Sequence, residues 1–342
     1  MHLLGLADRK IGKFALIGRT PSFYELLQIA VNFERSEPRD GIFAVLGMLL
    51  KQPESIIVNY TKSTEALLLE ITRYVLGRSN DLDAFHHISH RSDPRGICSW
   101  ILPYDRQVDK AWDPMRLSSS RFRACTGLEY PRDLGDACHN NDTITLAGLG
   151  IDSISFATPV CTVDIYENLG LVTDWLLDAM LSLSNSVEQS PANKMSLDLR
   201  GLIDLARVLT IEERVDGRTA EVEDLAVVTR WLTALLCRNA KDGPAPNENA
   251  LAREAHEAFS FMRLYSRRLF LTAAGRIGLG PRIARTGDIV AVLRGGDVPL
   301  ILRPLDHEYQ IIGEAYVSGI MRGEAVQEAQ ADGFAEQVFV IR

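Results

Sequence analysis

The chain has 342 residues, and its 37 Lys and Arg against 45 Asp and Glu give a formal net charge of −8. An apolar fraction of 46% and a charged fraction of 24% are typical of a soluble globular protein and exclude a wholly disordered chain, a collagen and a disulfide-rich miniprotein. The acidic balance disfavours nucleic acid as a partner, because nucleic-acid binding depends on Lys and Arg that neutralise phosphates.

No run of about 18 apolar residues is present, so the sequence predicts no membrane span. Residues 1–18 do not show the pattern of a secretion signal. The five cysteines are widely spaced, with no Cys-x-x-Cys pair, which favours reduced thiols in a cytoplasmic protein over zinc ligands. We therefore expect a cytoplasmic protein without metal or cofactor.

Residues 1–92 are predicted to be mainly helical. A helix should begin near Pro21, where a Ser-x-x-Glu capping box precedes apolar residues at helical spacing. It should end before Pro38, since a residue that precedes proline avoids the helical conformation. Two further helices are expected over residues 40–50 and 61–76.

Residues 93–165 are predicted to be irregular, with short strands. Their first part is rich in Pro, Asp, Ser and Arg and contains the isolated aromatic residues Trp100 and Trp112. This composition is typical of a segment that packs on a surface through a few large side chains. Strands are then expected over residues 143–149 and 151–156, separated by glycines.

Residues 166–265 are predicted to form a helical block. Apolar residues at helical spacing indicate helices over residues 172–183, 199–209 and 225–236. A fourth helix is expected over residues 251–265. Arginines cluster near 263–268 and 276–285, and a solvated face of mixed charge is the simplest interpretation of these clusters.

Residues 266–342 are predicted to form a β-rich module. Strands are expected over residues 269–272, 288–293, 299–302, 309–317 and 338–341. Gly295-Gly296 indicates a tight hairpin, because both central residues of the favoured turn have positive φ. Since short consecutive strands form a small curled sheet or barrel, the sequence predicts an α+β fold with a C-terminal barrel-like module.

The stretch 275–281, Gly-Arg-Ile-Gly-Leu-Gly-Pro, has the glycine content of a phosphate-binding loop. It lacks the Lys-Ser or Lys-Thr pair of such loops, and Pro281 removes a backbone donor. A tight turn between strands is the preferred interpretation.

Two patterns that contain histidine are candidate sites. His86 and His90 would share one face of a helix, as a metal-binding pair does, with His87 between them. Cys138 beside His139 has the composition of a thiol and base, but adjacent side chains rarely point at each other. A helix end or loop at the histidines, and no catalytic pair at Cys138, are the expected outcomes.

The charged residues of the C-terminal module are weak catalytic candidates: Arg303, Glu314 and Glu324. Carboxylates perform acid–base chemistry when their environments separate their pKa values. A structural ion pair between Arg303 and either Glu314 or Asp288 explains the same residues without catalysis. The residues that could contact a substrate or partner are Trp100, Trp112, Tyr316, Arg39, Asp40 and Asp288.

Residues 37–48 read EPRDGIFAVLGM and are followed by VNY, residues 98–100 read CSW, and residues 146–154 read LAGLGIDSI. A longer block runs from LFLT at residue 269 through GLGP, GDIV and PLILRP to GEAYVSGIMRGE at residues 313–324. In order and spacing, these segments resemble the region C-terminal to the HET domain in fungal heterokaryon incompatibility proteins. The motifs of the HET domain itself are not found, so the chain is expected to be the accessory half.

This resemblance implies a role in non-self recognition and programmed cell death, with a HET domain as partner in cis or in trans. The chain would then be a non-enzymatic regulatory module. The alternative is a stand-alone cyclase or isomerase of fungal secondary metabolism, because function depends on sites and not on folds. Its hydrophobic substrate would bind between the helical block and the β-module, near Trp100, Trp112 and Tyr316, with Arg303 or Glu314 inside. Enzymatic activity is therefore left open.

Overall fold

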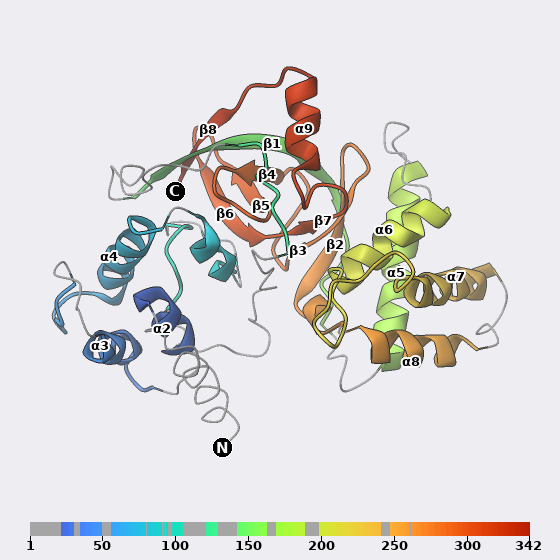
Figure 1. The fold of residues 1–342 in the computed structure, drawn as a ribbon, viewed down its shortest axis with the longest axis horizontal. Coiled ribbons are helices and arrows are strands. Elements are labelled where there is room, and N and C mark those ends of the chain that lie inside the picture. Colours follow the sequence, from blue (N-terminus) through green and yellow to red (C-terminus); the bar gives the residue numbers. More distant parts are fainter. Residues whose placement is uncertain are drawn as a thin grey trace.

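The computed structural model combines a central sheet with helices on two sides, an α+β fold (Figure 1). It describes residues 22–30, 35–49, 56–79, 81–90, 92, 94, 98–104, 121–128, 142–162, 169–188, 198–240, 247–259 and 261–342. Of the helices in these ranges, none has the length and apolar character needed to cross a membrane.

In the part of the N-terminal region that the structure describes, three α-helices and one 3₁₀ helix form an N-terminal helical unit on one side of the sheet (Figure 1). They are α2 (Phe23–Ala30), α3 (Pro38–Met48), α4 (Thr64–Leu76) and η1 (Asp83–His87). The predicted capping box is present, because the backbone N–H of Ser22 donates to Glu25 Oε2 at 2.8 Å and that of Glu25 donates to Ser22 Oγ at 3.2 Å. Pro38 begins α3, where its missing N–H is harmless.

Residues 98–104 connect this unit to the sheet. Trp100 is fully buried in one core with apolar residues from α2–α4 and from the strands. The backbone N–H of Ser99 donates to the carbonyl of Arg342 at 2.9 Å, and Ser99 Oγ accepts from the N–H of Ile311, also at 2.9 Å. The segment therefore packs on the sheet through a large aromatic side chain, as its composition predicts.

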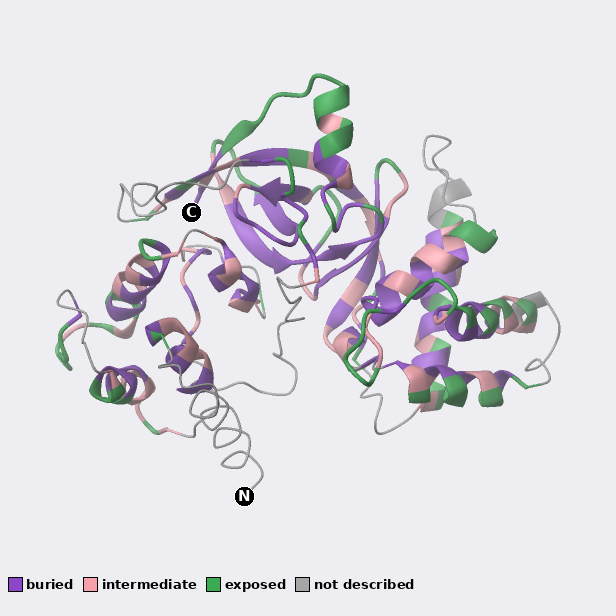
Figure 2. Cartoon of the chain, viewed as in Figure 1, coloured by how far each residue is buried: buried purple, intermediate pink, exposed green. Residues whose placement is uncertain are grey.

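Among the described residues, four α-helices and the 3₁₀ helix η3 form the central helical block on the other side (Figure 1). They are α5 (Leu169–Glu188), α6 (Leu199–Thr210), α7 (Ala226–Ala240), α8 (Glu248–Ala258) and η3 (Phe261–Leu264). Their buried faces turn toward one another and toward the sheet (Figure 2). The single helix expected over residues 251–265 is wrong, because Phe259 is extended and bridges to Arg214, which ends α8.

The strands form one sheet in the order β4-β5-β6-β8-β1-β2-β3-β7, and an additional β4–β1 pairing closes part of it into a ring, the barrel. They are β1 (Ile144–Ala157), β2 (Arg267–Thr272), β3 (Ile277–Pro281), β4 (Ile289–Leu293), β5 (Leu300–Pro304), β6 (Tyr309–Glu314), β7 (Tyr316–Val317) and β8 (Gln337–Ile341). The two strands expected over residues 143–149 and 151–156 are one continuous strand, β1. Register shifts after Gly150 and after Ile154 let β1 pair with β8, β4 and β2 in turn.

The turn expected over residues 275–281 is wrong for residues 277–281, which form strand β3. A turn does precede it, where Gly275 has φ +84°. In β3, a Cβ on Gly278 would clash with the ring of Phe270 on the paired strand. These strand glycines therefore allow close approach of an aromatic ring, a use of glycine that the turn interpretation overlooked.

The β4–β5 hairpin is longer than the tight turn expected at Gly295-Gly296. Residues 294–299 separate the strands, and only Gly295 of the pair has a positive φ, +75°. Its carbonyl accepts from the N–H of Leu82 at 2.8 Å, so this loop also contacts the N-terminal unit.

Helix α9 (Glu324–Ala331) was not predicted, because it buries little besides Ala325 and Val326 and so carries a weak apolar pattern. The four-region division of the chain remains a prediction.

Candidate interaction site between the barrel and the central helices

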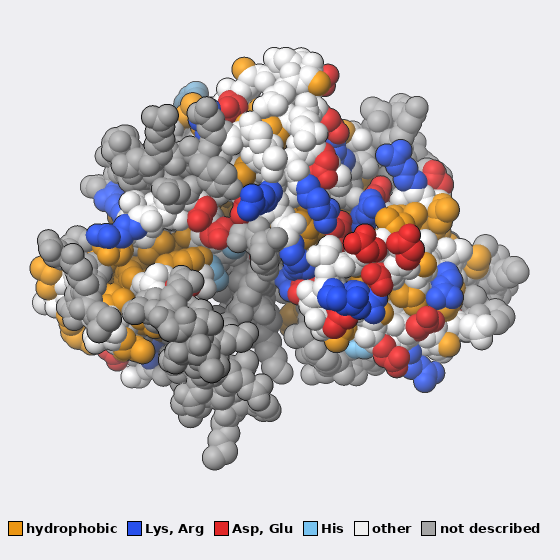
Figure 3. Space-filling model, viewed as in Figure 1, with side chains coloured by type: hydrophobic (Ala, Val, Ile, Leu, Met, Phe, Trp, Pro, Cys, Tyr) orange, Lys and Arg blue, Asp and Glu red, His pale blue; other side chains and the backbone are white. Residues whose placement is uncertain are grey.

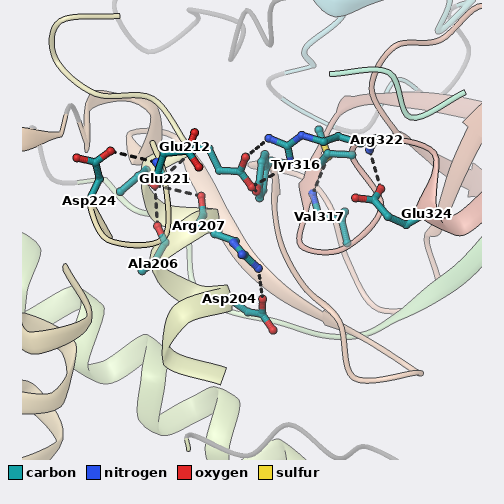
Figure 4. A network of polar contacts seen from close by, with 12 residues as sticks. Asp204, Ala206, Arg207, Glu212, Glu221, Asp224, Tyr316, Val317, Arg322 and Glu324 are labelled. Atoms are coloured by element: carbon teal, nitrogen blue, oxygen red, sulfur yellow. Dashed lines mark hydrogen bonds and ion pairs between the residues drawn. The ribbon is translucent and has the colours of Figure 1, made fainter. Parts of the chain in front are cut away.

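The segment that follows β6 carries the most specific motif of the sequence, GEAYVSGIMRGE. Tyr316 lies in β7 opposite Leu279 of β3, and its ring packs edge-to-face on Phe122 with centroids 5.7 Å apart. Gly319 and Gly323 then have φ values of +81° and +93°, which most residues avoid. These turns bring Arg322 back beside Tyr316 (Figure 4).

The acidic partner of these two residues comes from the far end of α6. Ile211 and Glu212 both lie in the left-handed region, with φ values of +51° and +50°. This conformation ends the helix, but for a β-branched residue it is strained by on the order of 1–3 kcal/mol. The N–H of Ala220 donates to the carbonyl of Glu212 at 2.9 Å, which helps to hold the turn.

Glu212, Tyr316 and Arg322 form a compact polar cluster, which we call the clasp (Figure 4). The Tyr316 hydroxyl donates to Glu212 Oε1 at 2.7 Å. Arg322 donates to both carboxylate oxygens, through Nη1 at 3.4 Å and through a short Nη2 contact. The Glu212 side chain is only 8% exposed, whereas that of Arg322 is 45% exposed. A buried carboxylate is thus held by two donors from the barrel.

The clasp has a defined protonation state at neutral pH. Burial raises the pKa of Glu212, but the hydrogen bonds from Arg322 and Tyr316 outweigh it, and the pKa is lowered below its usual value of 4.5. Burial, together with the charge of Glu212, raises the pKa of Tyr316 well above 10. The carboxylate is therefore ionised and the phenol protonated, the states that the hydrogen bonds require.

Further polar contacts follow the same boundary. Ser318 Oγ donates to Asp204 Oδ1 of α6 at 2.9 Å, and Asp204 also pairs with Arg207 at 3.2 Å. Glu213 pairs with Arg121 at 2.9 Å and with Arg263. Acidic and basic side chains lie side by side over this part of the surface (Figure 3). Asp204 and Glu213 therefore both have basic or hydroxyl partners at this boundary.

The other end of the motif contacts the N-terminal unit. Gly313, with φ +145°, forms a β-bridge with Ser89, and a Cβ on it would lie 2.8 Å from the carbonyl oxygen of Ile88. Glu314 is 1% exposed and lies near His86. Burial lowers the pKa of His86, and Glu314 opposes that shift. One twelve-residue segment of the barrel thus touches both helical regions.

Of the candidate site residues, Arg303 and Asp288 are brought together. Arg303 donates through Nε and Nη2 to the two oxygens of Asp288, each at 2.9 Å. Both side chains are almost fully buried, at 4% and 1% exposure. Of the two partners weighed for Arg303, Asp288 is the one that holds it. Glu324 lies elsewhere, where its carboxylate accepts from the N–H of Arg322 at 2.7 Å.

Arg39 and Asp40 tie the start of α3 to the loop before α4. Arg39 pairs with Glu37 at 2.7 Å and donates to the carbonyl of Tyr60, also at 2.7 Å. The hydroxyl of Tyr60 donates to Asp40 Oδ1 at 2.6 Å. Both residues of the motif therefore make local contacts within the N-terminal unit.

The aromatic candidates do not converge. Trp100 belongs to the core shared with α2–α4, and its indole N–H donates to the carbonyl of Asp142 at 3.3 Å. Tyr316 belongs to the core shared with α5–α8. Trp112 lies outside the described residues. The structure therefore does not place Trp100 and Tyr316 around a common cleft.

The remaining candidates have separate surroundings. His87 packs edge-to-face on Tyr24, and His90 Nε2 lies 3.2 Å from the carbonyl oxygen of Ser99. Cys138 and His139 fall outside the described ranges. Within those ranges, no three His, Cys, Asp or Glu side chains are grouped as metal ligands. Glu212 was missed, because nothing in the local sequence marks it apart from other acidic residues near helix ends.

The fold and the clasp define an α+β protein in which a small barrel joins two helical regions. Residues 246–335 match the Het-6 beta-barrel domain family. The chain is also similar to the heterokaryon incompatibility protein 6, OR allele, of Neurospora crassa, with 40% identity over 72 residues. It is therefore related to fungal heterokaryon incompatibility proteins, as the motifs predict.

This similarity has limited extent. It covers 20% of this chain and 11% of the Neurospora protein. No solved structure matches the chain. Strands β1 and β8 lie outside the residues that match the family, although both pair within the barrel. In this chain the barrel therefore includes strands from before and after the matched region.

Proposed function

We propose that the chain is a non-enzymatic regulatory or interaction module in heterokaryon incompatibility, acting in the cytoplasm in non-self recognition and programmed cell death. The observation that carries the proposal is the use of the motif segment. Tyr316, Ser318 and Arg322 bind side chains of the central helical block, and Gly313 binds the N-terminal unit. Contacts of this kind would hold the two helical regions in fixed positions on the barrel. The chain would then offer a rigid surface for binding a partner, which we call the platform.

The platform is held by buried charge-assisted contacts. Such contacts are stronger than neutral hydrogen bonds and fix the orientation of the groups that they join. The two helical regions would therefore present their outer surfaces in a constant relation to the barrel. A constant arrangement favours binding of a folded partner, because little ordering is needed on association.

A HET domain, joined in cis or supplied in trans, is the proposed partner. Isothermal titration of the purified chain with a purified HET domain should show one saturable site with a Kd in or below the micromolar range. An unrelated acidic β-barrel protein of similar size serves as the control and should give no saturable signal. No association with the HET domain at high micromolar concentration would contradict the proposal.

A further inference from the structure

One end of the barrel interior carries more positive than negative charge. Along β2, Phe270 faces the interior core, so Arg268, two residues earlier, lies on the same face nearer the end. Arg268 pairs with Gly280 of β3. Arg282 lies in the turn that follows β3, two residues before Ala284, which Arg268 contacts.

Neither arginine has a carboxylate partner in the part of the chain that the structure describes. Arg268 Nη1 donates to the carbonyl of Ala284 at 3.1 Å, while its Nε is buried without a hydrogen bond. The acidic side chain that acts on Arg268 is Asp288. Both oxygens of Asp288 already hold Arg303 at 2.9 Å, and one also accepts from the N–H of Arg285 at 2.9 Å.

This arrangement is unfavourable for the protein alone. Burial, and then the like charge of Arg282, lower the pKa of Arg268, and Asp288 only partly opposes them. Arg268 is partly buried, and a guanidinium that loses water without gaining a carboxylate costs free energy. Two guanidinium groups offer forked N–H donors that match the oxygens of a phosphate, and their charges balance those of a phosphate dianion.

We propose that Arg268 and Arg282 bind a phosphate group, free or carried by a small molecule, at this end of the barrel. The mouth of a β-barrel is a common place for a small ligand. The bound phosphate would supply the negative charge that Asp288, already paired with Arg303, does not supply. This site does not depend on a HET domain as partner, and it involves none of the clasp residues.

Thermal unfolding of the full chain tests the site, with inorganic phosphate as the probe at constant ionic strength. Phosphate should raise the Tm in a saturable way, since a ligand that binds only the folded state stabilises it. Sodium chloride and acetate at the same ionic strength should not. Adenosine diphosphate is the second arm: a larger shift than that from phosphate assigns the site to an organic phosphate, and an equal or smaller one to free phosphate.

Two substitutions locate the effect. Arg282→Gln should abolish the phosphate-dependent rise and should itself raise the Tm without phosphate, because it removes a like charge from beside Arg268. Arg268→Gln should abolish the rise as well. The matched control is Arg253→Gln on α8, an exposed arginine that donates through Nε to the carbonyl of Asn249 at 3.4 Å. It should leave the rise intact.

The proposal is overturned if phosphate does not raise the Tm, or if acetate or chloride raises it equally. It is also overturned if Arg282→Gln keeps the full phosphate response. Should Arg268→Gln fail to fold, Arg282→Gln decides alone, because Arg282 lies in the turn after β3 and is only partly buried.

Discussion

The clasp and the end of the barrel that holds Arg268 and Arg282 contain the same kinds of charged side chain. They differ in the ratio of acidic to basic groups. In the clasp, one buried carboxylate receives donors from Tyr316 and Arg322, so every charge has a partner. At the other site, Asp288 pairs with Arg303 and leaves Arg268 and Arg282 without a carboxylate in the described part of the chain. The ratio of acidic to basic groups, and not the residue type, therefore distinguishes a structural contact from a candidate binding site.

The largest expected effect comes from breaking the buried pair. Asp288→Ala leaves Arg303 buried without its carboxylate and should lower the free energy of unfolding by about 3–5 kcal/mol. Urea denaturation at pH 7, with an unchanged m-value, measures the loss.

The control for this prediction replaces both partners by apolar residues of similar size, Asp288→Leu with Arg303→Met. It should recover much of the lost stability, because the isolated charge is gone. If Asp288→Ala alone lowered the free energy of unfolding by less than about 1 kcal/mol, the pair would resemble an exposed one. The contrast between buried and surface charge would then fail.

Glu212→Gln should have the next largest effect. It removes the charge from hydrogen bonds to Arg322 and Tyr316, which are worth about 1.5–3 kcal/mol at pH 7. The folded state lowers the pKa of Glu212 below 4.5, so its stabilisation is complete above the unfolded pKa and is lost as pH falls through the folded pKa. The urea unfolding curves of wild type and variant should therefore converge in acid. A gap that stayed constant from pH 7 to pH 3 would contradict the ionised clasp.

Tyr316→Phe should cost less, about 1 kcal/mol at neutral pH, because Arg322 still binds the carboxylate. Its signature is at high pH. The pKa of Tyr316 is raised well above 10, so wild type loses stability as pH rises above the unfolded pKa of the phenol, whereas the variant has no phenol to ionise there. Equilibrium unfolding between pH 8 and pH 11 should show the gap closing. A gap that widened would rule out a protonated Tyr316.

Local patterns predicted much of the fold. The capping box at Ser22 and the apolar stripes of α5, α6 and α7 are signals that lie within a single helix, and the alternation of short apolar runs with glycines marked most strands. What failed was nonlocal. Glycines at 278 and 280 serve the ring of Phe270 on another strand, and β1 pairs with strands more than a hundred residues away.

The candidate site shows the same limit. Arg303 and Asp288 were weighed as a pair because both stand in the β-rich module, only 15 residues apart. Tyr316 was singled out, but its partner Glu212 lies 104 residues earlier. In the sequence, Arg268 and Arg282 are only members of two arginine clusters, for which a solvated face is the simplest interpretation. Only the pairing of β2 with β3 brings Arg268 close to the turn that holds Arg282.

The smallest effect is expected at an exposed pair, which supplies the lower limit of the comparison. Arg230 on α7 and Glu254 on α8 lie 3.2 Å apart, with side chains 60% and 57% exposed. Water and salt screen such pairs, so Arg230→Gln should lower the stability by less than about 0.5 kcal/mol, and raising the salt concentration should remove even that. Urea denaturation at low and high salt measures both. If this variant lost as much as Tyr316→Phe, burial would not be what gives the clasp its strength, and pairing alone would explain both regions.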